Sequence, residues 1–326
     1  MSAGDAPPAP SGPRQAYRDA LVELARADER VFCIDADTMG LQKTFGAEMP
    51  ERYINVGIAE ATAISIAAGL AASGQIPHFA TMATFVTFRA AEQIKVDVVG
   101  NDLPAKLIGS HGGFAAGHLG STHHALEDVA VMRSLPNMTV VVAADGARVE
   151  RLVPALAQVD GPTYLRIGRD ETLELGGNLD RLAVGEALTL REGNDVAIIA
   201  TGGYPLVFAL EAHDALAEQG IRARVIEMHT IAPIDAEAIV DAAASTAGIV
   251  AVEDHRVVGG LASAVAEVTA TSQPCRVTPV AVPLGERARG RVGSHPELLE
   301  AAGVQAEAVV DAARALVHSE QVAAPS

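Results

Sequence analysis

Short apolar runs alternate with amphipathic stretches along most of the chain. The runs 31–37 (VFCIDAD), 105–110 (AKLIGS) and 163–168 (TYLRIG) have the length and composition of buried strands. The stretch 14–28 (RQAYRDALVELARAD) instead spaces its apolar residues as an amphipathic helix does. This alternation is typical of α/β folds with mostly parallel sheets.

The same reading predicts further elements on both sides of a turn-rich, charged break at 171–195. The other predicted helices are 58–73, 85–99, 125–134, 146–158, 205–219, 235–245, 259–272 and 305–317. The other predicted strands lie at PHFATM, MTVVVAA, VAIIAT, ARVIEMHT (223–230), GIVAVED and RVTPVAV. We expect an α/β protein of two consecutive parallel-sheet domains: a disordered tail at 1–13, a domain at 14–175, a linker at 176–184 and a domain at 185–320.

Composition narrows the class of protein. A hydrophobic content of 49% with 20% charged residues is typical of a soluble globular chain, and no apolar run reaches the roughly 18 residues of a membrane span. The N-terminus lacks the features of a secretory signal. The two cysteines, Cys33 and Cys275, lie in no CxxC pair, which favours a reducing, cytoplasmic location. A net charge of −17 without tryptophan argues against nucleic-acid and anionic-membrane partners.

One carboxylate stands alone in the least charged part of the chain. Between Tyr53 and Phe88 the only Asp, Glu, Lys or Arg is Glu60, near the start of a predicted helix that is apolar on every side. Such a helix is expected to be buried all round. A carboxyl removed from water needs a partner or a raised pKa, so Glu60 is a candidate functional acid. A capping acid at a helix start is the alternative interpretation.

Aromatic and histidine residues cluster after two of the predicted strands. Phe85 and Phe88 are spaced to share one helical face, where they could form core or flank a flat ring. The glycine-rich loop SHGGFAAGHLGSTHH (110–124) holds four of the ten histidines at a spacing that fits no common metal site. In such a loop His111 and His123 are candidates for substrate contact and proton transfer.

These motifs occur in the order found in a known family. INVGIAEA, TFVTFRAAEQI, GSHGG…GSTHHALEDVAVMRSLPNMTVVVAADG and PTYLRIGR resemble the pyrimidine-binding domain of transketolases. DVAIIATGGYPL, VIEMHTIAPID and VAVEDHRVVGGLASAVAE resemble the transketolase C-terminal domain. The resemblance covers about 14–318, and the chain looks like the C-terminal subunit of a split, two-gene transketolase.

The resemblance implies a cofactor role for the isolated acid. In this family the acid at the position of Glu60 hydrogen-bonds N1′ of the pyrimidine ring of thiamin diphosphate and so favours its imino tautomer. Phe85 and Phe88 match the aromatic pair that holds the ring, although Ala91 stands where a third aromatic often occurs. Asp37 matches an acid near the thiazolium and the substrate channel.

The resemblance also implies substrate contacts. His111 and His123 match the substrate-facing histidines, and Arg169 and Arg14 match arginines that hold a sugar phosphate, a ligand that suits guanidinium groups.

The segment GHLG departs from the family pattern. Leu119 takes the place of an Asp that reads a sugar hydroxyl, and His118 precedes it. Leu41 lies where a phosphate-binding Ser is usual. Because leucine accepts no hydrogen bond, a less hydroxylated or unphosphorylated substrate is expected.

One part of the family's site is not found in this sequence. We find no GDG…N segment, which binds Mg²⁺ and the diphosphate, so no metal ligand is expected from this chain. The resemblance therefore implies an N-terminal transketolase subunit as partner, an α2β2 assembly, and two-carbon ketol transfer from a ketose to an aldehyde only in that complex.

Two alternatives remain open at this point. The chain could be the beta subunit of a 2-oxo acid dehydrogenase or of a decarboxylating acyl transferase, passing the unit to a lipoyl or carrier-protein thiol, or it could be a non-catalytic partner. In the second domain, Asp254 and His255 are interpreted as structural, and Gly202-Gly203 as a tight turn.

Overall fold

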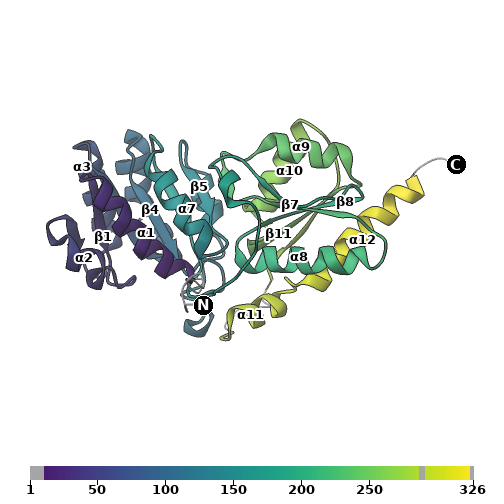
Figure 1. Ribbon diagram of the computed structural model, residues 1–326, viewed down its shortest axis with the longest axis horizontal. Helices are drawn as coiled ribbons and strands as arrows, with labels where there is room; N and C mark the ends of the chain where they lie inside the picture. The colour runs from purple at the N-terminus through teal and green to yellow at the C-terminus, as the bar shows by residue number, and fades with distance from the viewer. Residues whose placement is uncertain (1–10, 286–290, 324–326) are drawn as a thin grey trace, which may run out of the picture.

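Two sheets of mostly parallel strands organise this computed structural model, which describes residues 11–285 and 291–323 (Figure 1). The first sheet has seven strands in the order β10-β5-β6-β4-β3-β1-β2. Its strands are β1 Val31–Asp35, β2 Tyr53–Asn55, β3 Ile76–Met82, β4 Lys106–Ser110, β5 Thr139–Val142, β6 Thr163–Arg166 and β10 Thr230–Ala232. All neighbours are parallel except β10 and β5.

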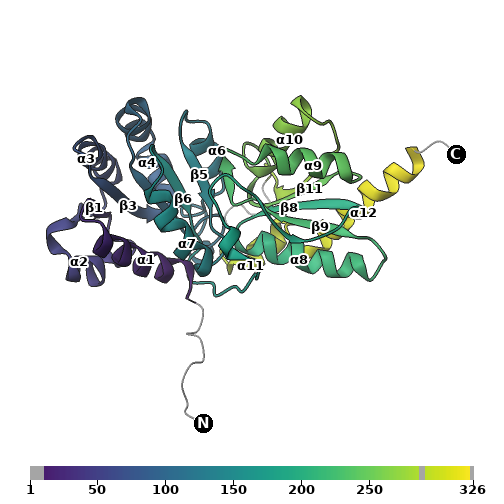
Figure 2. The same ribbon diagram turned by 45° about the horizontal axis from the view of Figure 1, so that its top comes forward.

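Helices cover both faces of the first sheet (Figure 2). α1 (Pro13–Ala27) and α7 (Gly146–Ala157) pack together on one face, and α3 (Glu60–Ala72), α4 (Ala83–Arg89) and α6 (Asp128–Arg133) lie on the other. The short helices α2 (Phe45–Glu48) and α5 (Ala91–Gln93) complete this lobe. α1 buries Ala16, Tyr17, Leu21 and Ala25, which recur at helical spacing and explain why this sequence forms a one-sided helix.

The second sheet has five strands in the order β12-β11-β8-β9-β7. They are β7 Leu188–Arg191, β8 Val196–Thr201, β9 Ala223–Glu227, β11 Ile249–Arg256 and β12 Val277–Val282, and only β7 and β9 pair antiparallel. α8 (Gly203–Ala217) and α12 (Ala306–Ala323) cover one face, and α9 (Ala236–Ser245) and α10 (Leu261–Thr271) the other (Figure 1). α11 (His295–Ala302) lies near the domain boundary. The predicted class, two mostly parallel α/β sheets, is confirmed.

Two predicted elements are broken in the structure. The helix expected at 85–99 ends at Arg89, resumes as α5 and continues as a π-helical turn, Ile94–Val98. The break lies at Ala90, whose φ of −119° leaves the helical region. The strand expected at 223–230 is two strands, β9 and β10, which belong to different sheets.

The short elements β2, β7, α2 and α11 were not predicted, because three to eight residues carry too little periodicity to register. The predicted tail lies mostly in residues 1–10, outside the part of the chain that the structure describes; α1 begins at Pro13.

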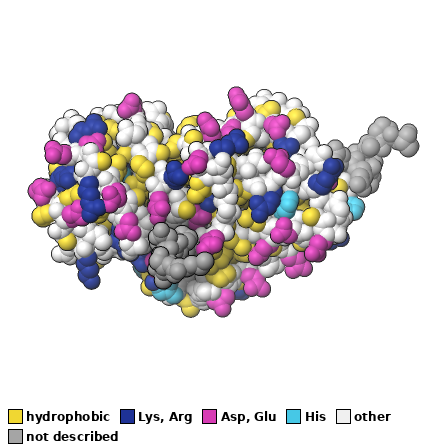
Figure 3. All heavy atoms as spheres, viewed as in Figure 1, with side chains coloured by type: hydrophobic (Ala, Val, Ile, Leu, Met, Phe, Trp, Pro, Cys, Tyr) yellow, Lys and Arg dark blue, Asp and Glu magenta, His cyan; other side chains and the backbone are white. Residues whose placement is uncertain are grey.

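The surface carries both signs of charge. Acidic and basic side chains are interspersed on the face shown in Figure 3, although the chain as a whole has a net charge of −17. Within the described ranges, no helix combines the length and the apolar character needed to cross a bilayer.

A histidine at the start of α11 joins the two domains. His295 Nε2 lies 2.7 Å from Asp254 Oδ2 at the end of β11, and its Nδ1 lies 3.2 Å from Glu171 Oε1, which follows β6. Burial by itself lowers the pKa of His295, but the charge and hydrogen bond of Asp254, with those of Glu171, outweigh it and raise the pKa to about 9. The pKa values of both carboxyls are lowered in turn, so the cluster is an imidazolium between two carboxylates.

This pairing predicts a pH-dependent stability. Because the pKa of His295 is raised from 6.5 to about 9, its contribution to the free energy of unfolding is complete below about pH 6.5 and is lost as pH rises through about 9. We expect wild type to exceed His295→Gln most at pH 6, with the gap narrowing progressively toward about pH 9–10. Urea denaturation of both chains across this range measures the gap, and a gap independent of pH would contradict the pairing.

Candidate functional site

The candidate residues collect at one edge of the first sheet. β6, β4, β3 and β1 are parallel neighbours, so their carboxyl ends meet at the same edge. Arg169 follows β6, His111 follows β4, Phe85 lies in the helix after β3 and Asp37 follows β1. Glu60 starts the helix after β2, the next strand along. Sheet order therefore explains how residues far apart in sequence form one row.

Glu60 is a buried acid with a basic partner. It is the first residue of α3 and is 3% exposed. Arg89 Nη1, at the end of α4, donates to Glu60 Oε1 over 3.1 Å. The Arg89 guanidinium carbon lies 3.9 Å from the centre of the Phe85 ring, so the cation stacks on an aromatic face while it pairs with the acid. A carboxylate beside an accessible aromatic face is an arrangement that suits a flat, nitrogen-containing ring.

Phe85 connects this acid to the histidine loop. Its ring and that of His123 meet edge to face with centroids 5.2 Å apart, and His123 Nδ1 lies 2.9 Å from Thr122 Oγ1. Phe88 does not share this position. Its exposed fraction is 52%, and the described contacts tie Phe85, not Phe88, to the surroundings of Glu60.

Three large apolar side chains are exposed on segments next to α3, the helix that Glu60 starts. Ile58 is 80% exposed, Phe88 52% and Val96 57%, and we call these three residues the apolar patch. Ile58 precedes α3, Phe88 lies in α4, and Val96 lies in the π-helical turn that packs against α3. An exposed cluster of this kind is typical of a surface that another molecule covers.

The prediction that α3 is buried all round is wrong for the single chain. One face of the helix is exposed through the small residues Thr62, Ser65, Gly69 and Ala72. The helix is apolar throughout, yet the first sheet covers only part of it. Ser65 Oγ donates to Asp97 Oδ2 over 2.7 Å, which places the uncovered face beside the π-helical turn that carries Val96.

His111 lies buried at the end of β4. Its Nδ1 is 2.9 Å from Ser110 Oγ, and the Ser110 hydroxyl donates to Thr81 O over 3.1 Å. Since that hydroxyl gives its proton to Thr81, Nδ1–H is the donor to Ser110, which leaves Nε2 free to accept. Burial first, then the charges of Arg14 and Arg169, lowers the pKa of His111 to about 4. His111 is therefore a neutral imidazole with an available nitrogen.

Two arginines converge beside the same loop. Arg14 binds Asp170 through two nitrogens, with Nη2 2.9 Å from Oδ2, and Arg169 Nε lies 3.2 Å from the same oxygen. Arg169 Nη1 also lies 3.2 Å from His118 Nδ1. Leu119, beside His118 in a short 3₁₀ turn, is 42% exposed. The structure thus brings together Arg14 and Arg169, the two arginines expected to hold a sugar phosphate, with His118 and an acid, Asp170, that was not predicted.

Sequence reasoning missed two residues of this region. The first is Arg89, which the sequence could have indicated as the partner of Glu60 because it is the next charged residue along the chain. Asp35 is buried within β1 and accepts from Tyr53 Oη over 3.1 Å, and burial raises its pKa. Asp37 is instead exposed, in the left-handed region at φ 62°. Strand alternation alone could not say which of the two acids turns inward.

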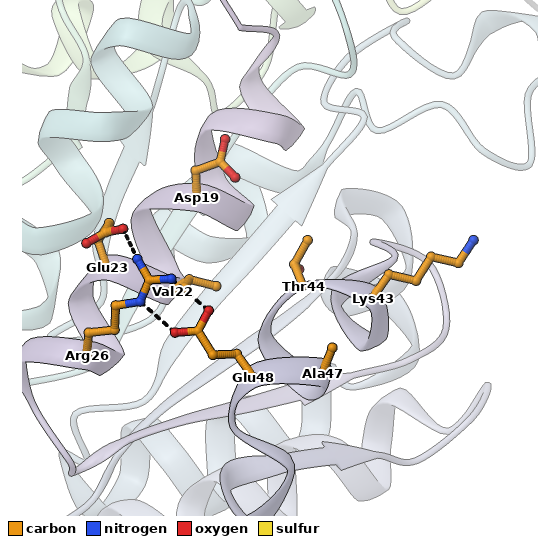
Figure 4. Close-up of a pocket in the computed structure, with 8 residues that line it drawn as sticks. All are labelled: Asp19, Val22, Glu23, Arg26, Lys43, Thr44, Ala47 and Glu48. Atoms are coloured by element: carbon orange, nitrogen blue, oxygen red, sulfur yellow. Dashed lines mark hydrogen bonds and ion pairs between the residues drawn. The ribbon is translucent and has the colours of Figure 1, made fainter.

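Other features of the described ranges offer no comparable site. Residues 11–285 and 291–323 contain no group of His, Cys, Asp and Glu able to hold a metal ion. A hollow of about 600 Å³ lies between α1 and α2 (Figure 4). Arg26 pairs there with Glu23 and Glu48, and no predicted site residue lines the hollow.

Comparison with known families agrees with this geometry. Residues 12–173 match the model of the transketolase pyrimidine binding domain, and residues 185–309 match that of the transketolase C-terminal domain. The chain is 39% identical over 302 residues to the 6-deoxy-6-sulfo-D-fructose transketolase subunit SqwH of Clostridium sp. (strain MSTE9), covering 92% of each.

Two further relatives have the same extent. One of the subunits of the apulose-4-phosphate transketolase of Phocaeicola vulgatus is 38% identical over 273 residues, 83% of this chain and 87% of its own. A solved split gene transketolase, described as an inactive beta4 tetramer, superposes with a TM-score of 0.84 at 38% identity, covering 94% of this chain and 98% of that one. This chain belongs to the transketolase family, as a subunit of the split type.

Proposed function

We propose that this chain supplies the pyrimidine half of a thiamin diphosphate-dependent transketolase, which moves a two-carbon ketol unit from a ketose donor to an aldehyde acceptor. The observation that carries the proposal is Glu60, a carboxylate excluded from water at an edge where an aromatic face and a neutral histidine also lie. Thiamin diphosphate supplies the carbon nucleophile that this chain lacks.

Each residue of the site would have a separate role toward the cofactor or the substrate. Glu60 holds the pyrimidine through a hydrogen bond at N1′, which requires the Arg89 side chain to yield that oxygen or to share the carboxylate. Phe85 lies against the ring, and the apolar surroundings exclude water. His111 has a free Nε2 for a donor hydroxyl, and the His123 ring meets the edge of Phe85 beside the pyrimidine position.

A partner subunit completes the proposal. Residues 11–285 and 291–323 contain no group of His, Cys, Asp and Glu able to hold Mg²⁺, and α3, which Glu60 starts, has an exposed face. We infer that an N-terminal subunit docks there, carries the metal and the diphosphate, and forms an α2β2 complex. The relative described as a beta4 tetramer is also described as inactive, which supports this dependence.

The first prediction concerns the lone chain. Without its partner it should turn over no ketose and bind thiamin diphosphate weakly, because only one half of the cofactor meets a prepared surface. Isothermal calorimetry with thiamin diphosphate and Mg²⁺, and a coupled assay of ketose cleavage, should both change when the N-terminal subunit is added. Full activity from the single chain would refute partner dependence.

A second prediction tests the acid. Glu60→Gln keeps the size of the side chain but removes its charge, so turnover in the reconstituted complex should fall by about 10²–10⁴-fold. Assembly, followed by analytical ultracentrifugation, should be unchanged. Glu211→Gln, the same exchange at an exposed carboxyl of α8 in the second domain, is the matched control. Unchanged turnover in Glu60→Gln would support a scaffolding role instead.

The substrate has an anionic end in this proposal. Arg14, Arg169 and His118 form a basic cluster that Asp170 only partly balances. The named substrates of two relatives, a sulfofructose and apulose 4-phosphate, carry a sulfonate and a phosphate. Such groups suit a pair of guanidiniums, so we infer a phosphorylated or sulfonated donor or acceptor, in place of the unphosphorylated substrate that Leu41 led us to expect.

Leu119 generates a third prediction. Its apolar side chain leaves a facing sugar hydroxyl without an acceptor, which costs about 1–3 kcal/mol. Leu119→Asp should therefore raise kcat/KM for polyhydroxylated aldehydes by about 5- to 100-fold relative to glycolaldehyde. Leu119→Asn is the control for size. If 2-oxo acids with a lipoyl acceptor outperform ketoses in wild type, the decarboxylating acyl transferase is the better assignment.

A further inference from the structure

The second domain holds the histidine loop of the first. Phe114 lies in the middle of that loop, is fully buried, and packs in the core of the second domain with Leu298. Gly117 lies so close to α11 that a Cβ there would be 2.5 Å from Gly293 O, and the Gly293 N–H donates to Gly117 O over 3.4 Å. The loop is thus built against the C-terminal domain and not against its own sheet alone.

One side chain ties this loop to the arginine cluster. Asp254 Oδ2 accepts from both the Phe114 N–H, over 3.2 Å, and His295 Nε2, over 2.7 Å. On its other side, His295 Nδ1 donates to Glu171 Oε1 over 3.2 Å, and Glu171 Oε2 accepts from the Arg169 N–H over 2.7 Å. His295 therefore lies at the centre of an unbroken path from the loop to Arg169.

The path borders a cavity of about 540 Å³ between the domains. His118 and Arg169 line one side of the cavity, and Tyr204, Ser294 and His295 line the other. The Arg169 side chain contacts His118 across 3.2 Å, so the two ends of the path meet again at the predicted anion-binding group. A shift of His295 would change the separation of the loop from Arg169.

We propose that His295 is a positioning residue of the C-terminal domain that sets the spacing between the histidine loop and Arg169, and thereby the affinity for the anionic end of the substrate. This inference rests on the proposed function, and it gives the second domain a part in substrate selection. His295 touches no substrate and acts through Glu171 and Asp254.

The chemistry of the position requires an imidazolium. Both ring nitrogens face carboxylate oxygens, so each must carry a proton. The other groups facing it are the Tyr204 ring of α8, at 4.7 Å between centroids, and Arg166, 3.9 Å from Asp254 Oδ2. Glutamine donates from a single nitrogen and carries no charge, so it preserves at most one half of the path.

The test compares two donors in the reconstituted complex of full-length chains, with saturating thiamin diphosphate and Mg²⁺. For His295→Ala we expect KM for fructose 6-phosphate to rise about tenfold or more, with kcat and the KM for hydroxypyruvate, which has no phosphate, within about twofold of wild type. The KM of His295→Gln for fructose 6-phosphate should lie between those of wild type and His295→Ala. Glu171→Gln, which removes one end of the path, should also raise KM for fructose 6-phosphate and leave KM for hydroxypyruvate unchanged. His318→Ala, an exposed histidine that contacts only the Arg314 carbonyl among the described residues, is the control.

Hydrogen exchange supplies a readout that does not need turnover. Amides at 112–119 and 168–171 should exchange faster in His295→Gln, with the rest of the first sheet unchanged. The inference would be overturned if KM rose equally for both donors in His295→Ala, if KM for fructose 6-phosphate did not change, or if these amides exchanged at the wild-type rate in His295→Gln. If the wild-type complex cleaves neither donor, the proposed function fails while the exchange result still decides whether His295 positions the loop.

Discussion

Exclusion of the Glu60 carboxylate from water constrains the chemistry and the surroundings of the whole site. Desolvating such a group costs several kcal/mol, while the start of a helix returns about 0.3–1 kcal/mol. Arg89 offsets part of this cost by pairing with the acid, and the Arg89 guanidinium stacks on the Phe85 ring. The charge-free sequence around Glu60 follows from the same requirement, because any other charge there would need a partner of its own.

His111 in the proposed site and His295 behind it differ through their environments. His111 is buried under two arginines and is held neutral, whereas His295 lies between two carboxylates and is held charged. Identical side chains thus serve as an acceptor within the site and as a cationic link behind it. In the proposed function the first domain provides the groups that would face ligands, and contacts of Phe114 with the second domain hold the loop that carries several of them.

Local patterns in the sequence were enough to predict the class of fold and the burial of Glu60. Strand runs and helical spacing indicated both sheets, and a single charge in an apolar window indicated the acid. Contacts between distant segments were not available from such patterns: the Arg89 pairing, the transfer of β10 to the first sheet, and the path through His295 all join separate elements. Helical spacing also does not determine which face of a helix is exposed: it placed Phe88 on the same face as Phe85, but the Phe88 ring is exposed.

β10 has a consequence for the independence of the two domains. It follows β9 of the second sheet by only a short turn, yet its residues Thr230 and Ala232 pair with Val141 and Val140 at the margin of the first. Cutting the chain between the domains would leave β5 with an unpaired backbone edge, which is a template for intermolecular strand addition. The main chain itself therefore joins the two domains into one cooperative unit. The domains could occur as separate chains only if another segment covered the exposed edge of β5.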